Sequence, residues 1–388
     1  MKRILIGIAV ATLVLVVAAF AFLPGFLDSR INRVADHAPY EVGKDAAARH
    51  DDLAVVDLHA DQLLWARDPL ERASRGHVDL PRLMDGNVTL QVFSVVTKVP
   101  RNQNYIGNSG DTDIITFLAM VQRWPARTWD SLLERALYQA DKLHRAEAAG
   151  PGDLKIVKSA AGLDALIEAR GEGKRPVGGL LAIEGAHPLE GKLENVQRLY
   201  DAGYRMIGLT HFFDNELGGS LHGLSGAGLT EFGRAAVREM ERLHIIVDLA
   251  HASPATVKDV LDIATRPVII SHTGVKGACD SPRNIDDALM KRIAETGGLI
   301  GIGYWEGAVC DPAPASVVKS IRYAIDLLGA DHVALGSDYD GAVSVAFDTS
   351  ELAALTAEMR KQGFTPEETG KVMGGNALRF LHAGLPDN

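Results

Sequence analysis

Cysteine is scarce in this sequence of 388 residues: only Cys279 and Cys310 occur, and neither belongs to a C-x-x-C pair. The chain can therefore form at most one internal disulfide. In an oxidising compartment these two thiols could pair, and the alternative is two unrelated buried cysteines.

Basic residues are also in short supply. The sequence has 40 Lys and Arg against 50 Asp and Glu, which gives a formal charge of −10 at pH 7. Because no basic surplus exists to neutralise phosphates, we expect no nucleic-acid partner, and small molecules are the expected ligands.

Repeats and low-complexity tracts are absent as well. With 47% hydrophobic and 23% charged residues, the composition is that of an ordinary globular protein. It excludes disorder, collagen and a coiled coil as descriptions of the whole chain. The length suits one large domain or two, and α/β barrels often use such a length for one domain.

One uncharged run, residues 4–23, is long enough to span a membrane, and it follows Met1-Lys2-Arg3. The run is typical of a signal anchor or of a cleaved signal peptide, for which Ala19-Phe20-Ala21 offers a small-x-small cleavage site. Lys2 and Arg3 keep the N-terminus cytoplasmic by the positive-inside rule. We therefore expect an extracytoplasmic protein, in the periplasm or at the cell surface, anchored or secreted through residues 1–23.

After this segment we expect a linker and lead-in at residues 24–50 and a catalytic domain at residues 51–388. Within that domain, apolar runs predict eight strands, at residues 53–58, 88–97, 177–183, 206–210, 245–249, 267–271, 299–304 and 332–337. Segments of 3.6-residue periodicity lie between most of them and predict helices, for example at 129–149, 193–202, 229–243, 254–264, 285–296 and 315–328.

Alternating helices and strands, with strands apolar on both faces, predict a parallel sheet, and eight such units predict a (β/α)8 TIM barrel. A long insertion at residues 99–175 separates the second and third strands and is expected to cover the functional site. Residues 365–382 open with a helix-start signal, Thr365-Pro366-Glu367-Glu368, and predict a closing helical layer.

The first strand ends in a His-x-Asp pair, His59 and Asp61. Residues i and i+2 of a strand point to the same side, so both side chains can reach one metal ion. Imidazole nitrogen and carboxylate oxygen suit zinc or a similar divalent metal. Taken alone, His59 could equally be a hydrogen-bonded histidine at a strand end.

Other polar residues also follow strands, and the carboxyl ends of barrel strands are where catalytic residues lie. They are Glu184, His211, His251, His272, Tyr304 and Asp338. The five ligand-type residues His59, Asp61, Glu184, His251 and His272 are too many for one tetrahedral zinc. They suit two ions bridged by a carboxylate, and Glu184 is the natural bridge. His187, three residues after Glu184, could be a partner of these ligands.

Together these motifs resemble the membrane (renal) dipeptidase family, zinc metallopeptidases of the amidohydrolase-like barrel group. The resemblance extends from about Leu53 to Arg379 and rests on His59-x-Asp61, Glu184-Gly185-Ala186-His187, Leu209-Thr210-His211, Asp248-Leu249-Ala250-His251, Ser271-His272, Ser281-Pro282-Arg283-Asn284 and Gly336-Ser337-Asp338-Tyr339-Asp340-Gly341.

The resemblance implies a role for each of these residues. One Zn²⁺ would be held by His59 and Asp61, a second by His251 and His272, and both by Glu184. His211 would contact the substrate, Arg283 would bind its terminal carboxylate, and Asp338 would move the proton. Tyr304 matches a further position that lines the family's site, and Cys279 and Cys310 stand where family members can carry a disulfide.

The expected activity is hydrolysis of dipeptides with a free C-terminal carboxylate, including ones with a C-terminal D-residue, by a hydroxide that bridges the two metals. The alternative is another hydrolase on the same metal site, acting on a lactone, a cyclic amide or a phosphotriester. A catalytically silent extracytoplasmic binding protein would leave the filled ring of ligand positions unexplained. The family alone suggests a homodimer, and an uncleaved N-terminal segment would add the membrane as a partner.

Overall fold

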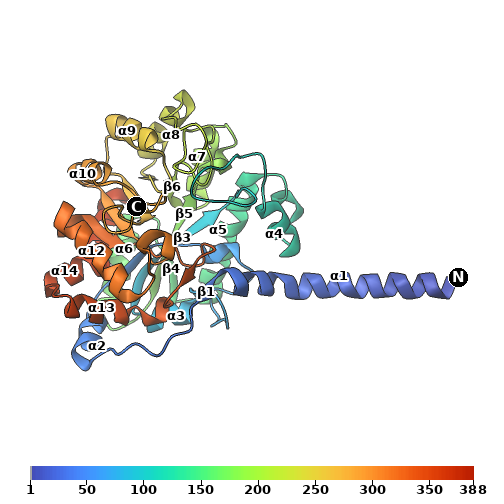
Figure 1. Ribbon diagram of the computed structural model, residues 1–388, viewed down its shortest axis with the longest axis horizontal. Helices are drawn as coiled ribbons and strands as arrows, with labels where there is room; N and C mark the ends of the chain where they lie inside the picture. Colours follow the sequence, from blue (N-terminus) through green and yellow to red (C-terminus); the bar gives the residue numbers. More distant parts are fainter. Residues whose placement is uncertain (1) are drawn as a thin grey trace.

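A computed structural model describes residues 2–388; at residues 9, 11, 13–17 and 19 it describes the backbone alone. One long helix, α1 (Lys2–Ile31), extends away from a rounded body that contains the rest of the chain (Figure 1). In the predicted anchor or signal segment, residues 1–23, Met1 and the side chains just named lie outside the described residues.

Within the described residues, no helix has both the length and the apolar character needed to cross a membrane.

The centre of the body is a closed barrel of eight parallel strands. Neighbouring strands pair in the order β3-β2-β10-β9-β8-β7-β6-β5, and a pairing between β3 and β5 closes the ring. The strands are β2 (Val55–Ala60), β3 (Val88–Val96), β5 (Val177–Glu184), β6 (Tyr204–Gly208), β7 (Ile246–Asp248), β8 (Ile269–Thr273), β9 (Leu299–Ile302) and β10 (Val333–Leu335). The predicted (β/α)8 TIM barrel is confirmed, with strand ends that differ from the prediction by a few residues.

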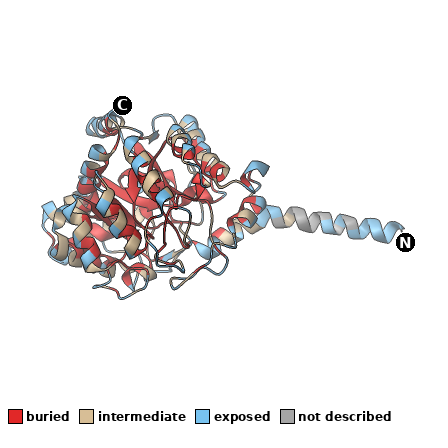
Figure 2. Cartoon of the chain, turned by 90° about the horizontal axis from the view of Figure 1, so that it is seen from above, coloured by how far each residue is buried: buried red, intermediate tan, exposed pale blue. Residues whose placement is uncertain are grey.

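Every residue of these eight strands is buried, because the barrel interior covers one face and helices cover the other (Figure 2). The covering helices include α5 (Leu132–Ala149), α6 (Ala160–Gly171), α7 (Glu194–Asp201), α8 (Glu231–Arg242), α9 (Pro254–Ile263), α10 (Asp287–Glu295), α12 (Pro314–Leu328) and α13 (Ala353–Lys361). Shorter helices are α2 (Lys44–Asp51), α3 (Leu80–Asp85), α4 (Ile115–Val121) and α11 (Glu306–Val309).

Local sequence decides where many of these helices begin. Ser131, Thr230 and Ser253 precede α5, α8 and α9, and each hydroxyl accepts a hydrogen bond from the backbone N–H three residues later. Such a bond satisfies one of the amides that a helix start leaves unpaired. In α9 the next residue is Pro254, whose fixed φ suits the first helical position.

Two small additions extend the barrel. The insertion at residues 99–175 contributes α4, α5 and α6 and a short strand, β4 (Leu154–Ile156), which pairs with β5 outside the ring. Near the start of the chain, β1 (Arg33–Val34) pairs in parallel with β11 (Ser344–Val345), which follows β10.

Residues 24–50, expected to be a linker and lead-in, make specific contacts with the barrel. Asp28, at 1% exposure, receives hydrogen bonds from Arg67 and Arg75, and the amide of Asn32 donates to Asp28. His50, in α2, contacts Thr356 of α13 through its Nδ1. Polar pairing of this kind has no hydrophobic pattern, and the sequence therefore gives little sign of it.

The closing layer consists of α14 (Pro366–Gly370), a π-helical turn (Lys371–Gly375) and α15 (Asn376–Gly384). The predicted helix start is confirmed, with a capping box between Thr365 and Glu368. Gly374, in the π-helical turn, lies directly against the start of β2. A Cβ at this position would overlap the carbonyl oxygen of Ala54 and would lie 3.0 Å from the backbone nitrogen of Val56.

We expect Gly374→Ala to lower the free energy of unfolding by about 3 kcal/mol, because the added methyl meets backbone that cannot move aside without displacing β2. Gly370→Ala is the matched control: this residue has helical φ and ψ, and an added Cβ would lie 3.6 Å from its nearest neighbour, Arg49 Nη2. Urea unfolding followed by circular dichroism would measure both. Equal effects of the two substitutions would contradict the close-contact argument.

Candidate metal centre and active-site pocket

A cavity of about 660 Å³ opens at the carboxyl ends of the barrel strands. This is the end at which barrel enzymes carry their active sites. Six of the residues singled out in the sequence line it: Asp61, Glu184, His211, His251, Arg283 and Asp338. His59 and His272 are buried directly beneath them, at 1% and 0% exposure.

Glu184, the last residue of β5, lies at the centre of the cluster. Its Oε1 is 2.9 Å from Nε2 of His251, 3.2 Å from Nε2 of His272 and 3.8 Å from Nε2 of His59. Its Oε2 is 3.4 Å from Nε2 of His211. One carboxylate therefore contacts side chains from β2, β8 and the segments that follow β6 and β7.

Two further carboxylates lie near the same ring nitrogen of His59. Its Nε2 is 3.6 Å from Asp61 Oδ2 and 3.9 Å from Asp338 Oδ1. Side chains of the cluster form three overlapping groups whose ligand atoms all lie within 4.8 Å of one another. The structure thus brings together all five residues predicted as metal ligands, with His211 and Asp338 beside them.

Burial and mutual repulsion dominate the electrostatics of the three carboxylates. Burial raises the pKa of Glu184 well above its usual value, and the charge of Asp61 raises it further. Burial also raises the pKa of Asp338 to about 7, with His59 opposing this shift and Asp61 adding to it. At His59 burial opposes a positive charge, but Asp61 and Glu184 outweigh it and raise the pKa to about 10. The cluster therefore stabilises a cation.

His251 and His272, which contact the same oxygen of Glu184, behave in the opposite way to His59. Burial lowers the pKa of His251 and His272 well below the usual value, and Arg283 and His59, respectively, lower it further. Both rings are therefore neutral near pH 7. Their Nε2 atoms nevertheless lie only 3.0 Å apart, facing the same carboxylate oxygen.

This donor set fits divalent metal ions. Among the described residues, buried His59 Nε2 and Asp61 Oδ1 have no hydrogen-bond partner, which would be costly without a ligand. Neutral imidazole nitrogens and carboxylate oxygens are ligands of zinc and similar metals. A cation at this point would satisfy these atoms and relieve the repulsion between the carboxylates.

Two buried aspartates outside the cluster hold the strand ends that carry it. Asp57 Oδ1 accepts from the backbone N–H of Ser337 at 2.8 Å, and Asp57 Oδ2 accepts from the Ser337 hydroxyl at 2.5 Å, which ties β2 to the residue before Asp338. Asp248 Oδ1 accepts from the backbone N–H groups of Ala250 and Ser271, both at 2.9 Å. Neither aspartate has a role predicted from the sequence, although Asp248 belongs to one of the quoted motifs and each lies two or three residues before a predicted ligand.

The backbone is also specialised where the side chains turn inward. His251 and Asp338 both have φ of 61°, in the left-handed region that residues other than glycine seldom occupy. Each follows the last residue of a strand by three positions, β7 and β10 respectively. Uncommon backbone of this kind is concentrated at functional sites, where the surrounding structure imposes it.

Arg283 comes from the loop after β8 and is 2% exposed. Its Nη2 donates to the carbonyl of His272 at 3.2 Å and lies 3.1 Å from Nε2 of His251, and its guanidinium lies 5.4 Å from the Trp305 ring centroid. The guanidinium therefore lines the cavity immediately beside the cluster.

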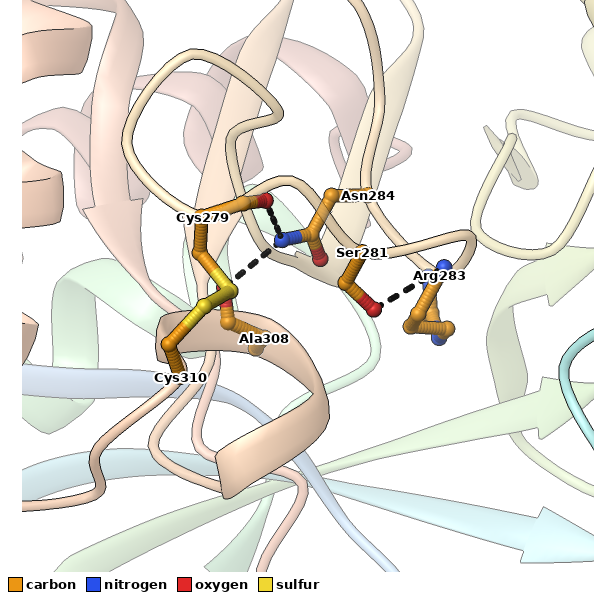
Figure 3. Close-up of a disulfide and its surroundings, with 6 residues drawn as sticks. All are labelled: Cys279, Ser281, Arg283, Asn284, Ala308 and Cys310. Carbon is orange, nitrogen blue, oxygen red and sulfur yellow. Dashed lines mark hydrogen bonds between the residues drawn. A yellow bond between two sulfur atoms is a disulfide. The ribbon is translucent and has the colours of Figure 1, made fainter.

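A disulfide between Cys279 and Cys310 joins the Arg283 loop to the end of α11, so the pairing implied by the family resemblance is confirmed (Figure 3). Beside it, the Asn284 side chain donates to the carbonyls of Cys279 and Ala308, both at 2.8 Å. Figure 3 shows the Arg283 side chain on the other side of the loop from the disulfide. The loop that carries this cation is thus fixed both covalently and by hydrogen bonds.

Tyr304 does not line the cavity, in contrast to the prediction. It is fully buried and packs against Tyr339 and Phe347, with ring centroids 5.5 and 5.3 Å away. The strand β9 ends at Ile302, so the alternation of sides does not continue to Tyr304, and the next residue, Trp305, lines the cavity instead.

His187, considered as a partner of the metal ligands, packs its ring against Phe213, with centroids 4.6 Å apart. Among the described residues neither of its ring nitrogens has a hydrogen-bond partner. Burial, with help from Lys98, lowers its pKa to about 3. The ring is therefore neutral and does not orient a ligand through a hydrogen bond.

Several residues that line the cavity carried no signal in the sequence. Tyr105, from the long insertion, accepts a hydrogen bond from Trp305 Nε1 at 3.0 Å. Leu27 and Ile31, at the end of α1, also line the cavity. Apolar and aromatic residues in loops and in a peripheral helix cannot be assigned to a site from local patterns alone.

A (β/α)8 barrel with clustered histidines and carboxylates at the carboxyl ends of its strands is the architecture of a metal-dependent hydrolase. Comparison with known proteins is more specific: residues 44–384 match the model of the membrane dipeptidase family, peptidase family M19. The chain belongs to this family and is a metallopeptidase.

Named relatives agree with this assignment. The chain is 31% identical over 353 residues to dipeptidase aclJ of Aspergillus oryzae, which covers 84% of this chain and 77% of the relative. It is 28% identical over 349 residues to an uncharacterised dipeptidase of Schizosaccharomyces pombe, and the alignment covers 84% of this chain and 79% of the relative.

Solved structures share the fold. A metallopeptidase from Rhodobacter sphaeroides, bound to a phosphinate mimic of L-Ala-D-Ala, superposes with a TM-score of 0.70 at 26% identity, covering 86% of this chain and 99% of that one. The probable dipeptidase PvdM of Pseudomonas aeruginosa gives a TM-score of 0.73 at 18% identity, covering 88% and 97%, and shows the shared fold alone.

Proposed function

We propose that the protein is a zinc-dependent dipeptidase that hydrolyses dipeptides with a free C-terminal carboxylate, including ones with a C-terminal D-residue. The observation that carries this proposal is the position of Arg283 beside the cluster around Glu184. The buried guanidinium of Arg283 lies 3.1 Å from Nε2 of His251, so it can bind a substrate carboxylate directly beside the cluster. The Rhodobacter sphaeroides structure with its mimic of L-Ala-D-Ala supports the D-residue.

His59 and Asp61 would hold one zinc ion, His251 and His272 a second, and Glu184 would contact both. Bound there, the ions would supply Lewis acidity, which polarises a peptide carbonyl and lowers the pKa of water. The short distances from Glu184 Oε1 to three imidazole nitrogens, 2.9–3.8 Å, support its role as the shared ligand.

Asp338 and His211 would act on the reacting groups. Asp338 lines the cavity beside Asp61, where its carboxylate can accept a proton from the attacking water and deliver it to the leaving amine. His211 lines the cavity next to Glu184, where an N–H of its ring can donate to the oxygen that becomes negative in the transition state.

Arg283 would fix the length of the substrate. A guanidinium can bind a carboxylate through two parallel hydrogen bonds, and the buried position of Arg283 strengthens such a contact. Because the clamp takes the terminal carboxylate, the bond next to the last residue lies over the cluster.

We also infer that the protein works outside the cytoplasm. The uncharged run at residues 4–23 after Lys2 and Arg3 is typical of a signal anchor or signal peptide. The Cys279–Cys310 disulfide supports this location, because disulfides persist in oxidising compartments.

The direct test is hydrolysis of L-L and L-D dipeptides and of their C-terminal amides by the zinc-loaded and the chelated protein. We expect zinc-dependent cleavage of dipeptides that have a free carboxylate, with much slower cleavage of the amides. Zinc binding without cleavage of any dipeptide would instead favour a hydrolase for lactones, cyclic amides or phosphotriesters.

We expect Arg283→Ala to raise KM for a free-carboxylate dipeptide roughly 10- to 100-fold, the effect of losing hydrogen bonds to a charged group. KM for the corresponding amide should change far less. Arg292→Ala, which removes a half-exposed arginine paired with Asp262 on the surface, is the matched control. Equal changes for acid and amide would refute the clamp.

We expect Asp338→Asn to retain bound metal but to lower kcat by about 10²- to 10⁴-fold, because the amide cannot transfer the proton. Metal content by atomic emission and kcat should be measured on the same preparation. Asp262→Asn, on the surface, serves as the control. Turnover that survives in Asp338→Asn would show that another group moves the proton.

A further inference from the structure

Part of the active-site cavity is lined by apolar residues that do not belong to the cluster around Glu184. This apolar wall consists of Leu27 and Ile31 of α1, Leu64 after β2, and Ile115 and Leu118 of α4. Leu64, Ile115 and Leu118 belong to one buried apolar cluster, and Leu27 packs against it. This cluster is separate from the two that form the barrel core.

The apolar wall lies across the barrel mouth from Arg283. Around the ring of eight strands, β3 and β8 are four positions apart, which places them diametrically opposite each other. Arg283 is in the loop after β8, whereas α4 is in the insertion after β3. The cluster around Glu184 lies between these two sides, because its members come from strands all around the ring: β2, β5 and β8, and the segments that follow β6, β7 and β10.

The end of α1 is held firmly in this position. Asp28 accepts from Arg67 Nε at 2.9 Å, and Arg67 Nη2 also pairs with Asp340 at 2.7 Å, two residues after Asp338. The Asn32 side chain accepts from the backbone N–H of Ala342 at 3.0 Å. The side chains of Asp28, Arg67 and Asp340 are almost fully buried, at no more than 2% exposure. The last turns of α1 are therefore a fixed part of the cavity.

The substrate orientation follows from these positions and rests on the proposed function. If Arg283 holds the terminal carboxylate and the cluster acts on the peptide bond, the N-terminal residue extends toward the apolar wall. The cavity volume of about 660 Å³ lies well inside the roughly 300–1,000 Å³ of pockets that bury drug-sized ligands. It therefore leaves room for a large side chain at that residue.

We propose that the apolar wall is the subsite for the N-terminal side chain of the substrate. Leu27 and Ile31 of α1 are specificity-determining residues that favour dipeptides whose N-terminal residue is large and apolar. Contact with the wall removes apolar surface of that side chain from water and so favours binding. An N-terminal glycine has no side chain to bury and gains no such binding energy.

The experiment compares kcat/KM for Phe-Gly, Gly-Phe and Gly-Gly in the zinc-loaded full chain and in the double variant Leu27→Ala/Ile31→Ala. We expect the ratio of Phe-Gly to Gly-Gly to fall about tenfold in the variant, the effect of losing a few methylene contacts. The ratio of Gly-Phe to Gly-Gly should stay within about twofold, because the C-terminal side chain lies on the Arg283 side.

Phe26→Ala is the matched control, since Phe26 is an apolar residue of the same helix turn that is 56% exposed and is not among the residues that line the cavity. Its ratios should equal those of the unchanged protein. Ile31→Ala alone, at a residue already 36% exposed, guards against misfolding of the double variant and should lower the Phe-Gly ratio in the same direction.

The outcomes separate the two proposals. Absence of cleavage of all three dipeptides by the unchanged protein would overturn the proposed function. Cleavage of all three with a Phe-Gly ratio that is the same in every variant would overturn the role of Leu27 and Ile31 alone. A parallel fall of the Phe-Gly and Gly-Phe ratios would also overturn it, because the wall would then not distinguish the two ends of the substrate.

Discussion

The site depends on one constraint: three buried carboxylates lie so close together that they cannot all be charged unless a positive charge lies among them. Asp61, Glu184 and Asp338 are buried within contact distance of His59, and burial with mutual repulsion raises the pKa of Glu184 and Asp338. Such an arrangement is unstable without positive charge. A divalent cation supplies more positive charge than a protonated histidine, so the crowding of these carboxylates suits a bound metal ion.

The barrel keeps these groups in place through strand ends that are tied to one another. Asp57 connects β2 to Ser337, and Asp248 connects β7 to Ser271 on β8. Both bonds run between neighbouring segments of the ring, directly below the ligands. These aspartates accept hydrogen bonds from backbone N–H groups, and Asp57 also accepts one from the Ser337 hydroxyl, so they fix the geometry of the neighbouring predicted ligands.

The barrel and the ligand cluster were predictable because their signals are local and regular. Each buried parallel strand is apolar on both faces, and each predicted metal ligand lies near the carboxyl end of such a strand or just after it, as with Glu184 at the end of β5 and His251 after β7. Tyr304 was placed wrongly because β9 ends at Ile302, and beyond a strand end the alternation of sides no longer predicts which side chain faces the cavity. The contact of α1 with the cavity depends on the pairs Asp28–Arg67 and Asn32–Ala342, which join residues far apart in the sequence and leave no periodic pattern.

The position of Leu27 and Ile31 has a consequence for how such enzymes diverge. The predicted metal ligands lie on the barrel, where a substitution disturbs many neighbours at once, but part of the cavity wall lies on a helix that precedes the barrel in the chain. Changes in that helix can alter the shape of the cavity without altering any ligand. Selection for a new substrate can therefore act on the leading segment while the catalytic barrel stays constant.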